Sequence, residues 1–144
     1  MTRYLLDVNV LIALIDPAHV QHDRAHYWFA AKGKRAWATC PLTENGVIRI
    51  VGHTRYPNSP GTPAAVAELF LTLRALGSHE FWPDDVTLYD KKRIRPARLL
   101  DSGQVTDTYL LALASAHRGQ FATFDHRLVT DAVIGGPQAL HLIG

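Results

Sequence analysis

The sequence predicts an α/β fold in which helices cover a parallel β-sheet of four to five strands. Short apolar segments typical of buried strands alternate with longer helical segments throughout the 144 residues. No hairpin motif joins two neighbouring strands, so each strand is expected to return to the sheet through a helix. No repeat, linker or low-complexity segment interrupts this alternation, and residues 1–144 are therefore expected to form one domain.

The first predicted unit is a strand followed by two helices. The strand covers residues 3–6, and the first helix covers residues 8–15 until Asp16–Pro17 stops it. The second helix is expected over residues 19–32, with Gly33 at its end.

The second predicted unit begins with RAWATC, a strand over residues 35–40. Pro41 breaks this strand, because proline lacks the N–H that a sheet needs, and a helix follows from Thr43 to about Val51. Residues 52–61 (GHTRYPNSPG) are rich in turn-forming residues and are expected to form a loop.

A further helix is predicted to begin at Thr62–Pro63, because threonine is a good N-cap and proline is favoured in the first helical position; it ends at Gly77. Its apolar side chains fall on one face, at Val66, Leu69, Phe70, Leu73 and Leu76. The third strand is predicted at HEFW, residues 79–82, and an irregular basic stretch follows from Pro83 to Gly103.

The clearest helix is VTDTYLLALASAHRGQ, which begins near Thr106–Asp107 and stops at Gly119. It is apolar nearly all round, so it should be largely buried. The fourth strand is predicted at QFATFD, residues 120–125, and a weaker final strand at ALHLIG, residues 139–144.

The composition is typical of a soluble globular protein, with 47% hydrophobic and 19% charged residues. The single cysteine, Cys40, excludes an intramolecular disulfide framework and favours a cytoplasmic location. No signal peptide and no apolar run of membrane-spanning length is visible, so no membrane association is expected. The net charge of +2 neither requires nor excludes a nucleic-acid partner.

Four acidic residues occupy equivalent places in this predicted topology. Asp7 and Asp125 end the first and fourth strands, while Glu44 and Asp107 lie in the first turns of two helices. Right-handed crossovers make the strands parallel, so strand ends and helix starts meet at one edge of the sheet, where open α/β folds bind ligands. The four carboxylates are therefore expected to converge there.

Each acid alone could be a helix cap or a partner of a helix dipole. Together they would repel, because two carboxylates about 5 Å apart at an effective dielectric constant of ~20 repel by roughly 3 kcal/mol. A set of carboxylates without Cys or His suits Mg²⁺ or Mn²⁺, and hence phosphodiester hydrolysis. Asn9 and Thr123 lie two residues from Asp7 and Asp125, where they can support the cluster or bond the local backbone.

Four motifs, LLDVNVLIAL, TENGVIRI, VTDTYLLALA and ATFD, occur in this order and together resemble a PIN-domain protein. More narrowly, they resemble the VapC ribonuclease toxins of bacterial toxin–antitoxin modules, and the similarity spans essentially the whole chain. The resemblance implies a three-layer α/β/α PIN fold. It places the family's acidic site on Asp7, Glu44, Asp107 and Asp125, so no acid of the site is missing.

The same resemblance implies an endoribonuclease that depends on Mg²⁺ or Mn²⁺ and cleaves structured RNA at few sites. It also implies a homodimer and a VapB-like antitoxin whose C-terminal segment blocks the site. Two alternatives stay open. One is a non-catalytic PIN-fold protein that binds RNA or the antitoxin. The other is a phosphatase of the haloacid-dehalogenase type, in which a second Asp would be expected where this chain has Asn9.

Two further motifs compete with or extend this interpretation. HDRAH places His22 and His26 on one helical face, as in zinc proteases, but Asp23 replaces the catalytic Glu and no third ligand follows. The run KKRIRPAR is either a solvated loop or an RNA-backbone contact. Its basic residues are Lys91, Lys92, Arg93, Arg95 and Arg98.

Overall fold

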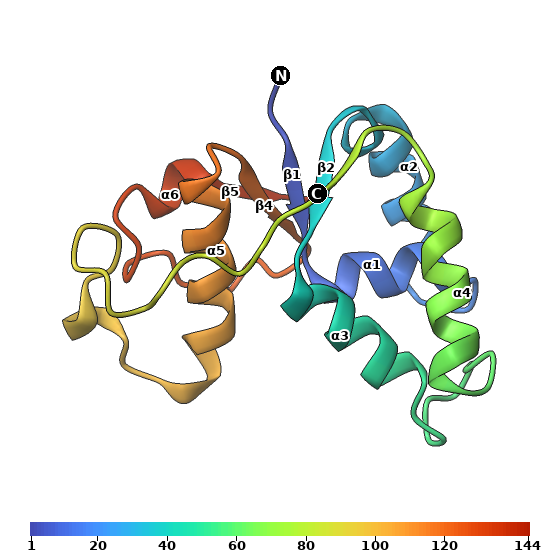
Figure 1. Cartoon of the computed structure of the whole chain (residues 1–144). Helices are drawn as coiled ribbons and strands as arrows, with labels where there is room; N and C mark the ends of the chain where they lie inside the picture. Colours follow the sequence, from blue (N-terminus) through green and yellow to red (C-terminus); the bar gives the residue numbers. More distant parts are fainter.

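The computed structural model describes residues 1–144 and has a five-stranded sheet between two layers of helices (Figure 1). The strands are three to four residues long and lie in the order β3-β2-β1-β4-β5. They are β1 (Tyr4–Leu6), β2 (Trp37–Thr39), β3 (His79–Phe81), β4 (Gln120–Thr123) and β5 (Leu140–Leu142). Every neighbouring pair is parallel, so the predicted α/β class and parallel sheet are confirmed.

Six helices connect the strands and cover the sheet. They are α1 (Val8–Ile15), α2 (His22–Ala31), α3 (Pro41–Val51), α4 (Pro63–Arg74), α5 (Val105–Ala116) and α6 (Gly136–Ala139). Helices α1–α4 lie on one side of the sheet, and α5 and α6 lie on the other (Figure 1). None of the helices combines the length and the apolar character that crossing a membrane requires.

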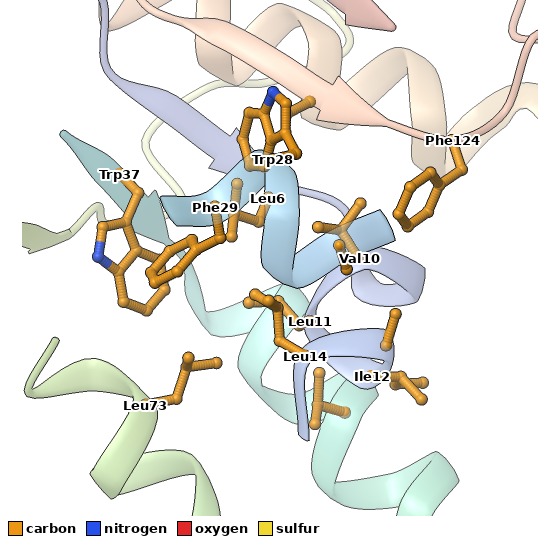
Figure 2. Close-up of a cluster of buried hydrophobic side chains, with 14 of the residues drawn as sticks. Leu6, Val10, Leu11, Ile12, Leu14, Trp28, Phe29, Trp37, Leu73 and Phe124 are labelled. Carbon is orange, nitrogen blue, oxygen red and sulfur yellow. The ribbon is translucent and has the colours of Figure 1, made fainter. Parts of the chain in front are cut away.

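The pleat of β1 divides the apolar side chains between two cores. Leu6 points into the core beneath α1–α4, whereas its neighbour Leu5 points into the core beneath α5. Figure 2 shows the first core, in which Phe29 of α2 and Trp37 of β2 pack edge to face with ring centres 5.2 Å apart. The same alternation decides which side chains can meet at the end of the sheet.

Helix α1 has its predicted bounds, but α2 begins at His22 and not at residue 19. The cause is a local turn: Asp16 Oδ1 accepts a hydrogen bond from the Ala18 N–H, and His19 Nδ1 accepts one from the Gln21 N–H. These bonds satisfy backbone N–H groups outside a helix and delay its start.

Helix α3 begins at Pro41, two residues before the predicted start, because proline occupies its first position and Thr43 Oγ1 accepts a bond from the Cys40 N–H. Helix α4 starts as predicted, with Thr62 Oγ1 accepting from the Ala65 N–H. It ends at Arg74, three residues before the glycine expected to stop it.

The region between β3 and α5 is irregular, as predicted, with 3₁₀ turns over Pro96–Arg98 and Ser102–Gln104. Two features of this side of the sheet were not predicted. Helix α6 is a single short turn, and Ile94 pairs antiparallel with Val133 across about 40 residues of chain. The pairing ties the basic stretch to the segment that follows β4.

Candidate functional site

Three of the four predicted acids lie on the α5 side of the sheet, at the carboxyl ends of the central strands. Asp7 directly follows β1 and is the N-cap residue of α1. Asp107 lies in the first turn of α5, and Asp125 lies two residues beyond the end of β4. Strands β1 and β4 are direct neighbours, so their ends meet at this edge.

Asp7 is buried, and its carboxylate is held by the neighbouring strand. Thr123 Oγ1 donates a hydrogen bond of 2.7 Å to Asp7 Oδ2, and the Asp7 N–H donates to the Ala122 carbonyl at 3.0 Å. The Asp7 side chain makes no capping hydrogen bond to α1. Asp7 therefore occupies the N-cap position of α1, but its carboxylate is engaged by Thr123 and does not cap the helix.

The Thr123 hydroxyl also accepts a 3.0 Å hydrogen bond from the Asp125 N–H, so one buried side chain contacts both acidic positions. The Asp125 Oδ1 atom accepts a 2.9 Å bond from the Arg127 N–H, which turns the chain after β4. Thr123 thus links Asp7 to the loop that carries Asp125. Asn9, the other proposed supporting residue, is exposed on α1 and its side chain makes no hydrogen bond to the protein.

Asp7 and Asp107 lie close enough to neighbouring carboxylates for their own ionisation to be disfavoured. Burial raises the pKa of Asp7, and the charge of Asp125 raises it further. Burial raises the pKa of Asp107 to about 6, with additional contributions from the charges of Asp7 and Asp125. Such mutual repulsion is the condition that a bound cation relieves.

Glu44, the fourth predicted acid, is held away from the other three. Its Oε2 atom accepts a 2.6 Å hydrogen bond from Thr39 Oγ1 and lies 3.5 Å from a guanidinium nitrogen of Arg74 on α4. Trp37, two residues before Thr39 on β2, packs in the core beneath α1–α4, so Thr39 faces that layer. Glu44 therefore points towards the opposite layer from Asp7. No group of three or more His, Cys, Asp or Glu side chains in the structure is spaced closely enough to hold a metal ion.

His79 completes the contacts around Glu44 and was not predicted from the sequence. Its Nε2 atom lies 2.7 Å from Thr39 Oγ1, and because that hydroxyl donates to Glu44, the histidine must be the donor. Burial, followed by the charges of Arg74 and Arg3, lowers the pKa of His79 to about 4, so it is neutral near pH 7. From the sequence, the segment HEFW that contains His79 predicted only a strand.

A hollow of about 240 Å³ lies beside Asp107 and Asp125. Gln104 and Arg127 are among the other residues that line it. The hollow gives a ligand access to two of the three repelling carboxylates from the α5 side.

The zinc-like histidine pair has a structural role instead. His22 Nδ1 lies 2.7 Å from the Ala13 carbonyl, and His26 Nε2 lies 2.8 Å from the Leu14 carbonyl. Both carbonyls belong to the last turn of α1, where backbone acceptors lack partners within the helix. The two rings therefore join α2 to the end of α1.

Comparison with known proteins adds evidence that is independent of this geometry. The PIN domain family model matches residues 4–131. Ribonuclease VapC44 of Mycobacterium tuberculosis is 47% identical over 133 residues, which cover 92% of this chain and 93% of the relative. Ribonuclease VapC39 of the same organism is 40% identical over 131 residues, covering 91% and 94%.

A solved structure, VapBC2 of Rickettsia felis bound to a DNA fragment from its promoter, has a chain that superposes with a TM-score of 0.57. The superposition covers 86% of this chain and 89% of that one, at 12% sequence identity, and supports the fold alone. The assignment to a family rests on the extent of the PIN domain match and on the sequence identity to two VapC proteins. The resemblance inferred from the four sequence motifs is thereby confirmed. The chain belongs to the PIN-domain family, among its VapC-type members.

Proposed function

We propose that this protein is a metal-dependent endoribonuclease and the toxin of a toxin–antitoxin pair. The observation that carries the proposal is the cluster of Asp7, Asp107 and Asp125 at the carboxyl end of a parallel sheet, with the pKa of Asp7 and Asp107 raised by burial and by neighbouring carboxylates. The similarity to proteins named ribonucleases supports the choice of RNA as substrate.

The proposed cofactor is Mg²⁺ or Mn²⁺, and the donor set fits either ion. All donors are carboxylate oxygens, which hard divalent cations prefer, and a cation would offset the repulsion among them. When bound, such an ion supplies Lewis-acid stabilisation of the charge that develops on a phosphate during hydrolysis.

The chain's own residues have separate tasks in this proposal. Asp7, Asp107 and Asp125 would hold the cation once their carboxylates draw closer together than they lie in this structure, and Thr123 orients the Asp7 carboxylate through its hydrogen bond. Glu44 is the fourth proposed ligand, and its side chain has to leave Thr39 and Arg74 before it can take part.

The proposed partners are structured RNA, a VapB-like antitoxin that blocks the site, and a second copy of the chain in a homodimer. The toxin–antitoxin part rests on the VapC names of the relatives and on the fold shared with a VapBC structure. A cytoplasmic location, expected from the lone Cys40, belongs to the same proposal.

Cleavage of total bacterial RNA by the purified protein, freed of any antitoxin, tests this function. We expect discrete fragments with Mg²⁺ or Mn²⁺ and none with EDTA. The rate of cleavage should be at least 100-fold lower in Asp7→Asn, because neutralising one carboxylate of a catalytic cluster removes stabilisation of the transition state. Asp23→Asn, which removes an exposed carboxylate from α2, is the matched control and should cleave normally.

A protein that is folded, binds RNA and yet cleaves nothing with either metal would contradict the proposal. That outcome would favour the non-catalytic alternative, a PIN-fold protein that only binds RNA or its antitoxin.

A further inference from the structure

A second hollow, of about 430 Å³, lies outside the acidic site and contains two arginines. Arg95 and Arg98 line it together with Thr130, Asp131 and the turn that begins α6. No large apolar side chain contributes to its wall. Such a lining is poorly suited to an apolar ligand and well suited to a charged or strongly hydrogen-bonding one.

The two hollows have no lining residue in common, but neighbouring segments of the chain line both of them. The chain leaves Asp125, lines the acidic hollow with residues 127–129, and then lines the second hollow with residues 130–131. On the other side, Gln104 lines the acidic hollow while its Nε2 atom donates a 3.1 Å hydrogen bond to the Arg98 carbonyl. The carboxylates and the arginines are therefore presented by adjacent segments of the chain.

The basic residues of the run 91–98 are not equivalent. The guanidinium of Arg93 pairs with Asp90 at 3.7 Å, and Lys91 and Lys92 are exposed and do not line the hollow. Only Arg95 and Arg98 line the hollow, so these two residues differ in position from the other three basic residues of the run.

Arg95 and Arg98 differ in how they are held. Arg95 Nη1 donates hydrogen bonds to the Asp131 and Val133 carbonyls, at 3.1 and 3.4 Å, which fix its guanidinium across the Ile94–Val133 pairing. The Arg98 guanidinium makes neither a hydrogen bond nor a salt bridge to the protein, and the Asp131 carboxylate forms a salt bridge with neither arginine. One arginine is thus positioned and the other keeps all of its donors free.

We propose that this second hollow binds a backbone phosphate of the RNA strand, next to the phosphodiester that lies at the carboxylates. The inference rests on the proposed ribonuclease function and deepens it. A planar guanidinium with free N–H groups matches the oxygen atoms of a phosphate, and phosphate contacts set the position of a strand without reading its sequence. The arginines would also offset the repulsion between the acidic cluster and the negatively charged substrate.

The test is the salt dependence of RNA binding in the full chain carrying Asp7→Asn, which prevents cleavage, with Mg²⁺ present and a fluorescein-labelled RNA stem–loop as probe. Arg98→Ala should weaken binding roughly tenfold at low salt and reduce the slope of log K against log salt by about 0.7–1, because one phosphate contact is lost. Lys92→Ala removes the same charge from the same run, outside the hollow, and should leave the slope unchanged.

Arg98→Lys should retain most of the slope, because it keeps the charge. Both substitutions are at an exposed position, and an unchanged thermal unfolding midpoint would show that the fold is intact. Titration with inorganic phosphate separates a general anion site from an RNA site. Phosphate binding that Arg98→Ala abolishes, with RNA affinity unchanged, would overturn the assignment to RNA.

Equal slopes for Arg98→Ala and Lys92→Ala would overturn the phosphate site while leaving the ribonuclease proposal intact. Weaker antitoxin binding by Arg98→Ala, with RNA binding unaffected, would also overturn the phosphate site and would favour a protein partner for this hollow. If the wild-type chain neither bound nor cleaved the stem–loop or total RNA with Mg²⁺ or Mn²⁺, the proposed function itself would fail.

Discussion

Asp107 lies in the first turn of α5, where burial and the charges of Asp7 and Asp125 oppose its ionisation. Without a bound cation, the ionised Asp107 carboxylate should therefore cost folding stability at neutral pH, through burial first and charge repulsion second. Asp107→Asn removes the charge and keeps the shape of the side chain. We therefore expect the variant to be more stable than the wild type in EDTA, although it should lose the proposed activity.

The size of the expected stabilisation by Asp107→Asn follows from the pKa of Asp107, which rises from its ordinary value of 3.8 to about 6. A rise of this size corresponds to about 3 kcal/mol of unfavourable interaction with the ionised form. Because Asp107 is only partly buried, solvent screening should reduce the measured effect to about 2 kcal/mol.

The sign of the pH dependence is set by which state binds the proton more tightly. The pKa of Asp107 is higher in the folded protein than in the unfolded chain, so the folded state binds the proton more tightly. Stability is therefore greatest below pH 3.8 and is lost as the pH rises to about 6. The stabilisation by Asp107→Asn should be less than about 1 kcal/mol at about pH 4 and reach its full value at about pH 7.5.

Urea unfolding of both proteins in EDTA, at these two pH values, measures the difference. Glu68→Gln, which neutralises an exposed carboxylate on α4, is the control and should show little change between them. If Asp107→Asn gave the same difference in the free energy of unfolding at both pH values, burial and the neighbouring charges would not disfavour the ionised form of Asp107 as inferred. Adding Mg²⁺ should stabilise the wild type more than the variant, because the variant lacks one proposed ligand.

Two further substitutions test the positioning of the site and the packing beneath it. Thr123→Val removes the hydroxyl that donates to Asp7, so we expect about a 10- to 100-fold lower initial rate of RNA cleavage. Thr123→Ser keeps the hydroxyl and should restore the rate. An unaltered rate in the valine variant would show that this hydrogen bond does not orient the carboxylate. Gly119→Ala should lower the free energy of unfolding, measured in urea, by about 2–3 kcal/mol. The added Cβ would overlap the Arg3 carbonyl oxygen and lie 2.9 Å from the Trp82 ring. A urea unfolding midpoint equal to that of the wild type would mean that the backbone can shift there at little cost.

The sequence by itself determined the fold class, the parallel sheet and the placement of three acids. These depend on local rules that a single chain displays. Alternating strands and helices require crossovers, and right-handed crossovers bring all the carboxyl ends of the strands to one edge. Asp7, Asp107 and Asp125 follow from that rule because each lies at a strand end or a helix start on the α5 side.

The direction of Glu44 was decided only by the tertiary structure. Its place in the first turn of α3 follows from the sequence, but its side chain can turn towards either layer of helices. It turns towards α4 because Thr39 faces that layer and Arg74 supplies a positive charge there. Both partners are outside the helix that carries Glu44, and no pattern in the sequence pairs them with it.

The arginine hollow likewise depends on contacts between distant segments. The run 91–98 shows five basic residues in the sequence, but the pairing of Ile94 with Val133 selects which of them line a cavity. Local propensity and periodicity describe a residue and its near neighbours along the chain. Which side chains meet across the fold depends on the packing of whole elements, and that information appears only when the chain is folded.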